Sequence, residues 1–76
     1  MQIYIGNLSQ MTTTHHLVNL FLPFGKVRFS RIASDEKTGR SLGFGYIEMD
    51  PTGAKNAIRK LNRILFMNSY MEVKEV

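Results

Sequence analysis

The 76-residue chain contains no cysteine, which excludes the disulfide-bonded secreted domains that are common at this size, and thiolate metal sites with them. No apolar run approaches the roughly 20 residues that a helix needs to cross a bilayer. The N-terminal MQIYIGNLSQ has neither the basic region nor the long apolar stretch of a signal peptide. We therefore expect a cytoplasmic protein with no membrane segment.

No stretch rich in proline, glycine or serine divides the chain, and no internal repeat is visible. With 43% hydrophobic and 21% charged residues, the composition is that of an ordinary globular protein. We predict one small domain over residues 1–76. Ten Lys and Arg residues against six Asp and Glu residues give a net charge of +4, which favours polyanionic partners without identifying one.

Strand and helix patterns alternate along the chain. Four segments read as strands, with alternating apolar residues: 2–8, 27–33, 42–49 and 70–76. One helix follows the threonines at 12–14, and a second begins at the Asp50–Pro51 pair. The order strand, helix, strand, strand, helix, strand predicts an α+β, ferredoxin-like βαββαβ sandwich. In this fold two helices cover one face of a four-stranded antiparallel sheet and leave the other face open.

Large aromatic residues are predicted on the open face. If the apolar positions of the strands point toward the helices, the period of two forces Tyr4, Phe44 and Tyr46 outward, and we expect these rings to lie bare and coplanar. Flat rings on a basic protein suit unpaired bases, since stacking is worth ~1–3 kcal/mol per base. The pattern thus predicts single-stranded RNA binding. Single-stranded DNA stays open as a ligand, because no residue indicates a contact to the 2′-hydroxyl group.

Two glycines flank Phe44 in the third strand segment. We expect Gly43 and Gly45 to let the helices pack close beneath this strand, because neither has a side chain. The alternative is that both lie at a β-bulge.

The segments IYIGNL at 3–8 and LGFGYIEM at 42–49 resemble the paired hexamer and octamer motifs of the RNA recognition motif family. The resemblance covers essentially the whole chain. Small single-domain bacterial members are particularly similar, because their octamer often closes in Glu-Met, as Glu48 and Met49 do here. The resemblance implies that the three stacking aromatics of the family are Tyr4, Phe44 and Tyr46.

The octamer departs from the family pattern at both ends. Its first position, usually a Lys or Arg that contacts phosphate, is Leu42, and its last aromatic is Met49. Arg40, two residues earlier, is a candidate to replace the missing phosphate contact. Arg31 and Lys74 are expected to flank the aromatic surface on the sheet face.

Three further residues are candidate contacts. With strict alternation, Phe29 shares the open face with Arg31 as a fourth ring, although it can equally pack at the sheet edge. Gln2 and Asn7 could hydrogen-bond base edges near Tyr4, and Asn7 could instead hold the turn after the first strand together.

We also considered a protein-interaction surface, an enzyme and a metal site. Val18 and Leu22 lie one helical turn apart, which suggests a protein-interaction surface or a weak homodimer through the helical face, or an extension of the core. No catalytic arrangement is recognisable, and the loop GNLSQM lacks the Arg that an acylphosphatase needs there. His15 and His16 point about 100° apart on a helix, which disfavours a metal site. We expect a non-enzymatic protein without cofactor or metal.

Overall fold

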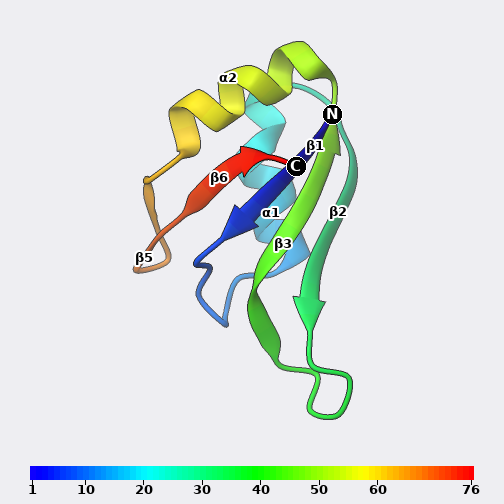
Figure 1. Ribbon diagram of the computed structural model, residues 1–76, viewed down its shortest axis with the longest axis vertical. Coiled ribbons are helices and arrows are strands. Elements are labelled where there is room, and N and C mark those ends of the chain that lie inside the picture. Colours follow the sequence, from blue (N-terminus) through cyan, green and yellow to red (C-terminus); the bar gives the residue numbers. More distant parts are fainter.

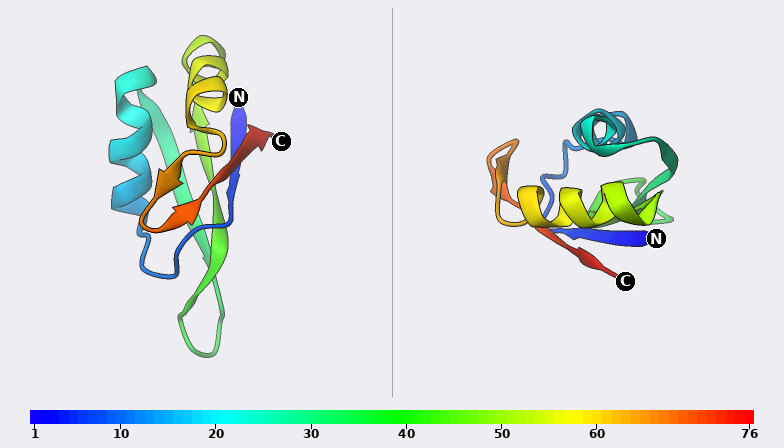
Figure 2. Two further views of the ribbon diagram at one scale, coloured as in Figure 1. Left: turned by 90° about the vertical axis from the view of Figure 1, so that its left-hand side faces the viewer. Right: turned by 90° about the horizontal axis from the view of Figure 1, so that it is seen from above.

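The computed structural model describes residues 1–76 and has the predicted two layers, so the fold class is confirmed (Figure 1). The antiparallel sheet has the strand order β2-β3-β1-β6. Its strands are β1 (Gln2–Gly6), β2 (Val27–Ser34), β3 (Ser41–Met49) and β6 (Glu72–Glu75). Helices α1 (Thr14–Phe21) and α2 (Pro51–Leu61) pack on the same side of the sheet and leave its other side uncovered (Figure 2). Neither helix has the length and apolar character that spanning a membrane requires.

Helix α1 begins with a reciprocal capping pair. Thr13 Oγ1 accepts a hydrogen bond from the His16 backbone N–H at 3.2 Å, and His16 Nδ1 accepts one from the Thr13 N–H at 3.0 Å. The histidine takes the place that Glu or Gln has in the usual capping box. The chain leaves the helix through a short 3₁₀ turn, η1 (Leu22–Phe24), which contains Pro23. The α-helix therefore ends before Pro23, which has no backbone N–H to donate.

Helix α2 begins as predicted, because Asp50 Oδ2 accepts a hydrogen bond from the Thr52 N–H at 3.2 Å and Pro51 occupies the first turn. Gly53 in that turn lets α2 approach η1 closely, since a Cβ atom there would meet the Phe24 carbonyl oxygen. The apolar face of α2 lies over the sheet, and its opposite face is exposed.

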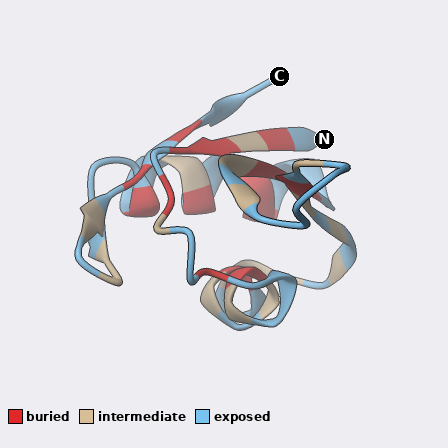
Figure 3. Ribbon diagram, turned by 90° about the horizontal axis from the view of Figure 1, so that it is seen from below, coloured by how far each residue is buried: buried red, intermediate tan, exposed pale blue.

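The core lies between the sheet and the helices, where Figure 3 shows the buried positions concentrated. The inward positions of the sheet alternate as predicted and meet apolar residues from both helices. The largest fully buried side chains are those of Phe21, Ile3, Ile5, Leu17, Ile47, Met49, Met71 and Val73. Each such side chain contributes roughly 1.5–3 kcal/mol by leaving water, so the sheet is fixed with its other face outward.

The C-terminal strand is shorter than the predicted 70–76. Two-residue strands β4 (Leu65–Phe66) and β5 (Ser69–Tyr70) form a separate hairpin, which the sequence analysis missed. Its turn residues, Met67 and Asn68, have φ angles of 49° and 67°, as the two central residues of a tight hairpin turn require.

Backbone contacts to the segment after α2 separate this hairpin from β6. The Met71 N–H donates to the Ile64 carbonyl at 3.0 Å, and the Arg63 N–H donates to the Met71 carbonyl at 2.8 Å. Two residues further along the chain, the Val73 N–H donates to Asn62 Oδ1 at 2.9 Å. The end of α2 is thereby attached to the outer edge of β6.

Candidate nucleic-acid interface

On the uncovered face of the sheet, one row of side chains crosses all four strands. Arg31 of β2 pairs with Tyr46 of β3, Tyr46 pairs with Tyr4 of β1, and Tyr4 pairs with Lys74 of β6. Directly paired residues of antiparallel strands project from the same face. Two tyrosines therefore lie at the centre of the sheet with one cation on each side, and Phe44 joins them from β3, two residues before Tyr46.

Tyr4, Phe44 and Tyr46 form a close ring cluster. The prediction that the three rings are coplanar is wrong. The Tyr4 and Phe44 centroids are 6.0 Å apart with planes inclined by 30°. Tyr46 is inclined by 65° to Tyr4, at 5.8 Å, and by 90° to Phe44, at 6.2 Å. Edge-to-face contacts of this kind follow from the positive edge and negative face of an aromatic ring. Only Tyr4 and Phe44 approach a common plane, and each of the three rings is half-buried.

The ring of Tyr4 lies directly over Gly6 of the same strand. A Cβ atom on Gly6 would come within 2.6 Å of Tyr4 Oη and 2.8 Å of a ring carbon. Any side chain at position 6 would thus push the ring out of its place. Gly6 gives the Tyr4 ring the space to lie flat along the sheet.

The two glycines beside Phe44 have a different role from the one predicted. A Cβ atom on Gly45 would meet the Arg31 carbonyl oxygen of β2, and one on Gly43 would be 3.3 Å from the Leu8 carbonyl oxygen. These neighbours are backbone atoms of a strand and a loop, so the glycines do not serve helix packing. At Gly43 the alternative of a bulge is correct, because its φ is +83° and the β2–β3 register shifts nearby.

Lys74 lies beside the Tyr4 ring, with Nζ 5.3 Å from the ring centroid, within the range of a cation–π contact. Its other partner is Glu72, whose Oε1 is 3.8 Å from Nζ. Both side chains of this ion pair are more than half exposed, at 62% and 57%, and such pairs contribute little to stability. The Lys74 ammonium group is therefore available to an incoming anion next to the aromatic cluster.

Phe29 is on the open face, as strict alternation predicted, although the strand before it is irregular. The β2–β3 register shifts between Val27 and Phe29, and Phe29 then pairs with Glu48 of β3. Gln2 of β1 pairs with the same Glu48, so Gln2 and Phe29 belong to the row next to the tyrosines. Phe29 is 50% exposed and makes no ring contact with the three clustered aromatics.

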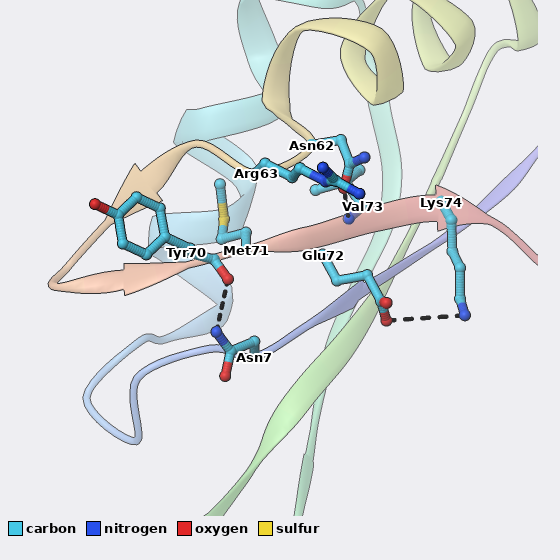
Figure 4. Close-up of a pocket in the computed structure, with 8 residues that line it drawn as sticks. All are labelled: Asn7, Asn62, Arg63, Tyr70, Met71, Glu72, Val73 and Lys74. Carbon is cyan, nitrogen blue, oxygen red and sulfur yellow. Dashed lines mark hydrogen bonds and ion pairs between the residues drawn. The ribbon is translucent and has the colours of Figure 1, made fainter.

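Arg40 and Asn7 are not in the aromatic rows. Arg40 is in the connection between β2 and β3, where its carbonyl accepts the Asp35 N–H at 2.8 Å. Asn7 has a φ of 55°, and its side-chain nitrogen donates to the Tyr70 carbonyl at 2.6 Å (Figure 4). This bond ties the turn after β1 to β5, which supports the turn-holding role for Asn7.

A shallow hollow beside Tyr4 and Phe44 adds residues that the sequence analysis did not single out. Its volume is about 530 Å³, and its polar lining includes Gln10 and Ser41. The hollow exists because the Leu8 N–H donates to the Gly43 carbonyl at 2.8 Å, which brings the loop after β1 against the start of β3. The sequence carries no local signal for this long-range contact.

Comparison with known proteins agrees with this arrangement. The family model for the RNA recognition motif matches residues 3–72. The chain belongs to the RNA recognition motif family. Among its relatives is RbpE of Nostoc sp., which is 36% identical over 99% of this chain and 77% of RbpE.

Solved structures of RNA recognition motif proteins and their relatives have the same fold. The crystal structure of the RNA binding protein PG1 is 39% identical and superimposes with a TM-score of 0.98 over 100% of this chain and 93% of PG1. A chain of a Sxl-lethal protein/RNA complex is 29% identical, with a TM-score of 0.92 over 99% of this chain and 46% of that one. The segments 3–8 and 42–49, which resemble the family motifs, lie along β1 and β3, the strands that carry the ring cluster.

Proposed function

We propose that residues 1–76 act as one unit that binds single-stranded RNA on the uncovered sheet face. The observation that carries this proposal is the row Arg31–Tyr46–Tyr4–Lys74, with Phe44 beside it. Bases stack on the rings, and the two cations at the ends of the row pair with phosphates. The family membership and the similarity to a chain from a protein/RNA complex support this ligand.

The remaining candidates have subordinate roles in this proposal. Gln2 and Phe29 extend the binding surface along the neighbouring row, with Phe29 as an additional ring. Asn7 offers its side-chain oxygen to a base edge while its nitrogen holds the turn. Arg40 meets phosphates of an RNA that reaches the β2–β3 connection.

Binding of this kind needs no reacting group, cofactor or metal, because stacking and charge pairing form no covalent bond. We infer a non-enzymatic protein that acts in the cytoplasm, where single-stranded RNA is available. Two or three stacked bases at ~1–2 kcal/mol each, with two or three phosphate contacts, correspond to a dissociation constant near 1 μM, about −8 kcal/mol.

A protein contact or homodimer through the helical face has less support. Leu22 is 55% exposed, but Val18 is half-buried, so the two do not form a broad apolar patch. The helical face therefore remains the alternative that the following experiment is designed to detect.

The test is a titration of the labelled protein with single-stranded RNA, followed by amide chemical shifts. We expect the largest shifts in β1 and β3, at Tyr4, Phe44 and Tyr46, and small shifts in α1. Shifts confined to α1, or no shifts at all, would contradict the proposal. A parallel titration with DNA of the same sequence measures how far the 2′-hydroxyl group contributes.

Gly6→Ala is expected to weaken RNA binding about fivefold, because the new Cβ atom displaces the Tyr4 ring from its stacking position. The domain should stay folded, since the group that must move is the end of a side chain. The matched variant is Tyr4→Ala, which removes the ring altogether. In a protein that already carries Tyr4→Ala, adding Gly6→Ala should not lower the RNA affinity further. If fluorescence anisotropy shows that the two losses of affinity are fully additive, the role of Gly6 is refuted.

A further inference from the structure

The net positive charge of the protein is not on its aromatic face. Residues 51–71, which include α2 and the β4–β5 hairpin, contain four cations and no acidic residue: Lys55, Arg59, Lys60 and Arg63. The other six Lys and Arg residues of the chain are matched in number by its six Asp and Glu residues. The whole formal charge of +4 is therefore concentrated in this one segment.

These four side chains are exposed and have no acidic partner. The ion pair in the structure joins Lys74 to Glu72, and no carboxylate lies within ion-pair distance of the α2 cations. Arg59 donates only to Asn56 Oδ1, at 2.7 Å on the same helix. A group of unpaired cations on one helix creates a local positive potential that attracts polyanions.

A hollow beside β6 lies between the segment that follows α2 and Lys74, the residue at the end of the tyrosine row. The hollow has a volume of about 450 Å³, and its lining includes Arg63 from the segment after α2 and Lys74 from β6. Figure 4 shows Arg63 reaching from the segment after α2 toward Val73, with Lys74 further along the same strand. Glu72 is the acidic residue of the lining, and its Oε1 is 3.8 Å from Lys74 Nζ.

Cationic side chains are therefore present at intervals between the ring cluster and α2. Lys74 Nζ lies beside the Tyr4 ring, Arg63 lines the same hollow as Lys74, and Lys60 and Arg59 are in the last turn of α2. Phosphates of a single strand recur at regular intervals along its backbone, so a strand that leaves the tyrosines over β6 meets a second series of cations.

We propose that the C-terminal turn of α2, with Arg63 and the hollow beside β6, is a second binding site, for the phosphate backbone of the same RNA. It rests on the proposed RNA binding and extends it: bases bind on the sheet face, and the continuing strand crosses the β6 edge onto Arg63, Lys60 and Arg59. Contacts there are to phosphates, so they add affinity without base preference.

The test compares random-sequence RNA of four and twelve nucleotides at several salt concentrations, with anisotropy as the readout. Each phosphate contact to a single strand contributes about −0.7 to the slope of log affinity against log salt. We expect a slope near −2 for the short RNA and near −4 for the long RNA. The slope is measured as well as the affinity, because a longer RNA also binds somewhat more tightly by offering more positions, and the α2 variant below assigns the added slope to its site.

The double variant Arg59→Gln/Arg63→Gln should weaken binding of the long RNA at least fivefold and make its salt slope shallower by about 1.4. The affinity for the short RNA should change less than twofold. The control, Lys26→Gln, removes one exposed charge from the loop before β2 and should affect both RNAs equally. Equal slopes for the two RNAs, or a loss of long-RNA affinity per removed charge that is no larger in the α2 variant than in the control, would overturn this proposal.

The outcomes also separate this proposal from the proposed function. If the wild type does not bind the short RNA, the proposed base stacking on the sheet is wrong, whether or not α2 binds RNA. If the short RNA binds normally but the α2 variant has no specific effect on the long RNA, the second site alone is wrong. A poly-glutamate peptide that competes better than the long RNA would assign the α2 cations to an acidic protein and would likewise overturn it.

Discussion

Replacing Phe44 by alanine is expected to weaken RNA binding at least fivefold while the domain stays folded. The centroids of the Phe44 and Tyr4 rings are 6.0 Å apart, and their planes are inclined by only 30°, the smallest angle within the ring cluster. Loss of one stacked base costs ~1–3 kcal/mol, which is about a fivefold to hundredfold loss of affinity. Phe44 is outside the buried core cluster, so its removal leaves the sheet–helix packing intact.

Two further variants identify the cause of this loss. Phe44→Tyr keeps a ring at the same place and should bind RNA within about twofold of the wild type. Leu22→Ala removes an exposed apolar side chain from the helical face and should have no effect on RNA binding. Anisotropy titrations measure all three variants, and thermal unfolding confirms that they are folded. Unchanged affinity in Phe44→Ala, or a loss in Leu22→Ala, would place the binding surface elsewhere.

Gly45→Ala is expected to have the largest effect on stability, a loss of about 3 kcal/mol or more in the free energy of unfolding. The new Cβ atom would meet the Arg31 carbonyl oxygen of the neighbouring strand. This oxygen is a backbone atom, so it cannot move aside by a change of rotamer as a side-chain atom can. Strands β2 and β3 would have to separate where Gly45 pairs with Ile32. For a domain of this size such a loss lowers the midpoint of thermal unfolding by roughly 12–24 °C.

Gly39→Ala is the control for the stability effect of adding one methyl group to a glycine. Position 39 is in the β2–β3 connection, with a φ of +75° and no atom within 4 Å of the added Cβ atom. Its cost is backbone strain alone, about 1–2 kcal/mol. If calorimetry finds Gly45→Ala no less stable than Gly39→Ala, then the steric conflict with β2 is not what requires glycine at position 45.

The sequence predicts the main elements of the fold because their signals are local. Asp50 and Pro51 start α2 by capping its first turn, and alternating apolar residues in β1 and β3 place one face of each strand in the core. The β4–β5 hairpin could not be predicted in this way. Its strands have two residues each, and its separation from β6 depends on hydrogen bonds of Met71 to Arg63 and Ile64, which are close only after folding.

The same distinction applies to the candidate site. Alternation alone predicts that Tyr4, Phe44 and Tyr46 share a face, and it predicts the side on which Phe29 lies. The angles between the rings depend on how the side chains pack against one another, so the expectation of coplanarity was wrong. The reasons for Gly6 and Gly45 are also tertiary, since they depend on where the Tyr4 ring and the Arg31 carbonyl come to lie.

The attachment of α2 to β6 has a consequence for how the protein behaves at high concentration. An edge strand with free N–H groups is a template onto which a strand of another molecule can add, and this is a common route to aggregation. On β6 the Val73 N–H already donates to Asn62, and the backbone of Met71, just before β6, is hydrogen-bonded to Arg63 and Ile64. The outer edge of the sheet is thus closed to intermolecular strand pairing at these positions, and the aromatic face beside it can stay open to solvent.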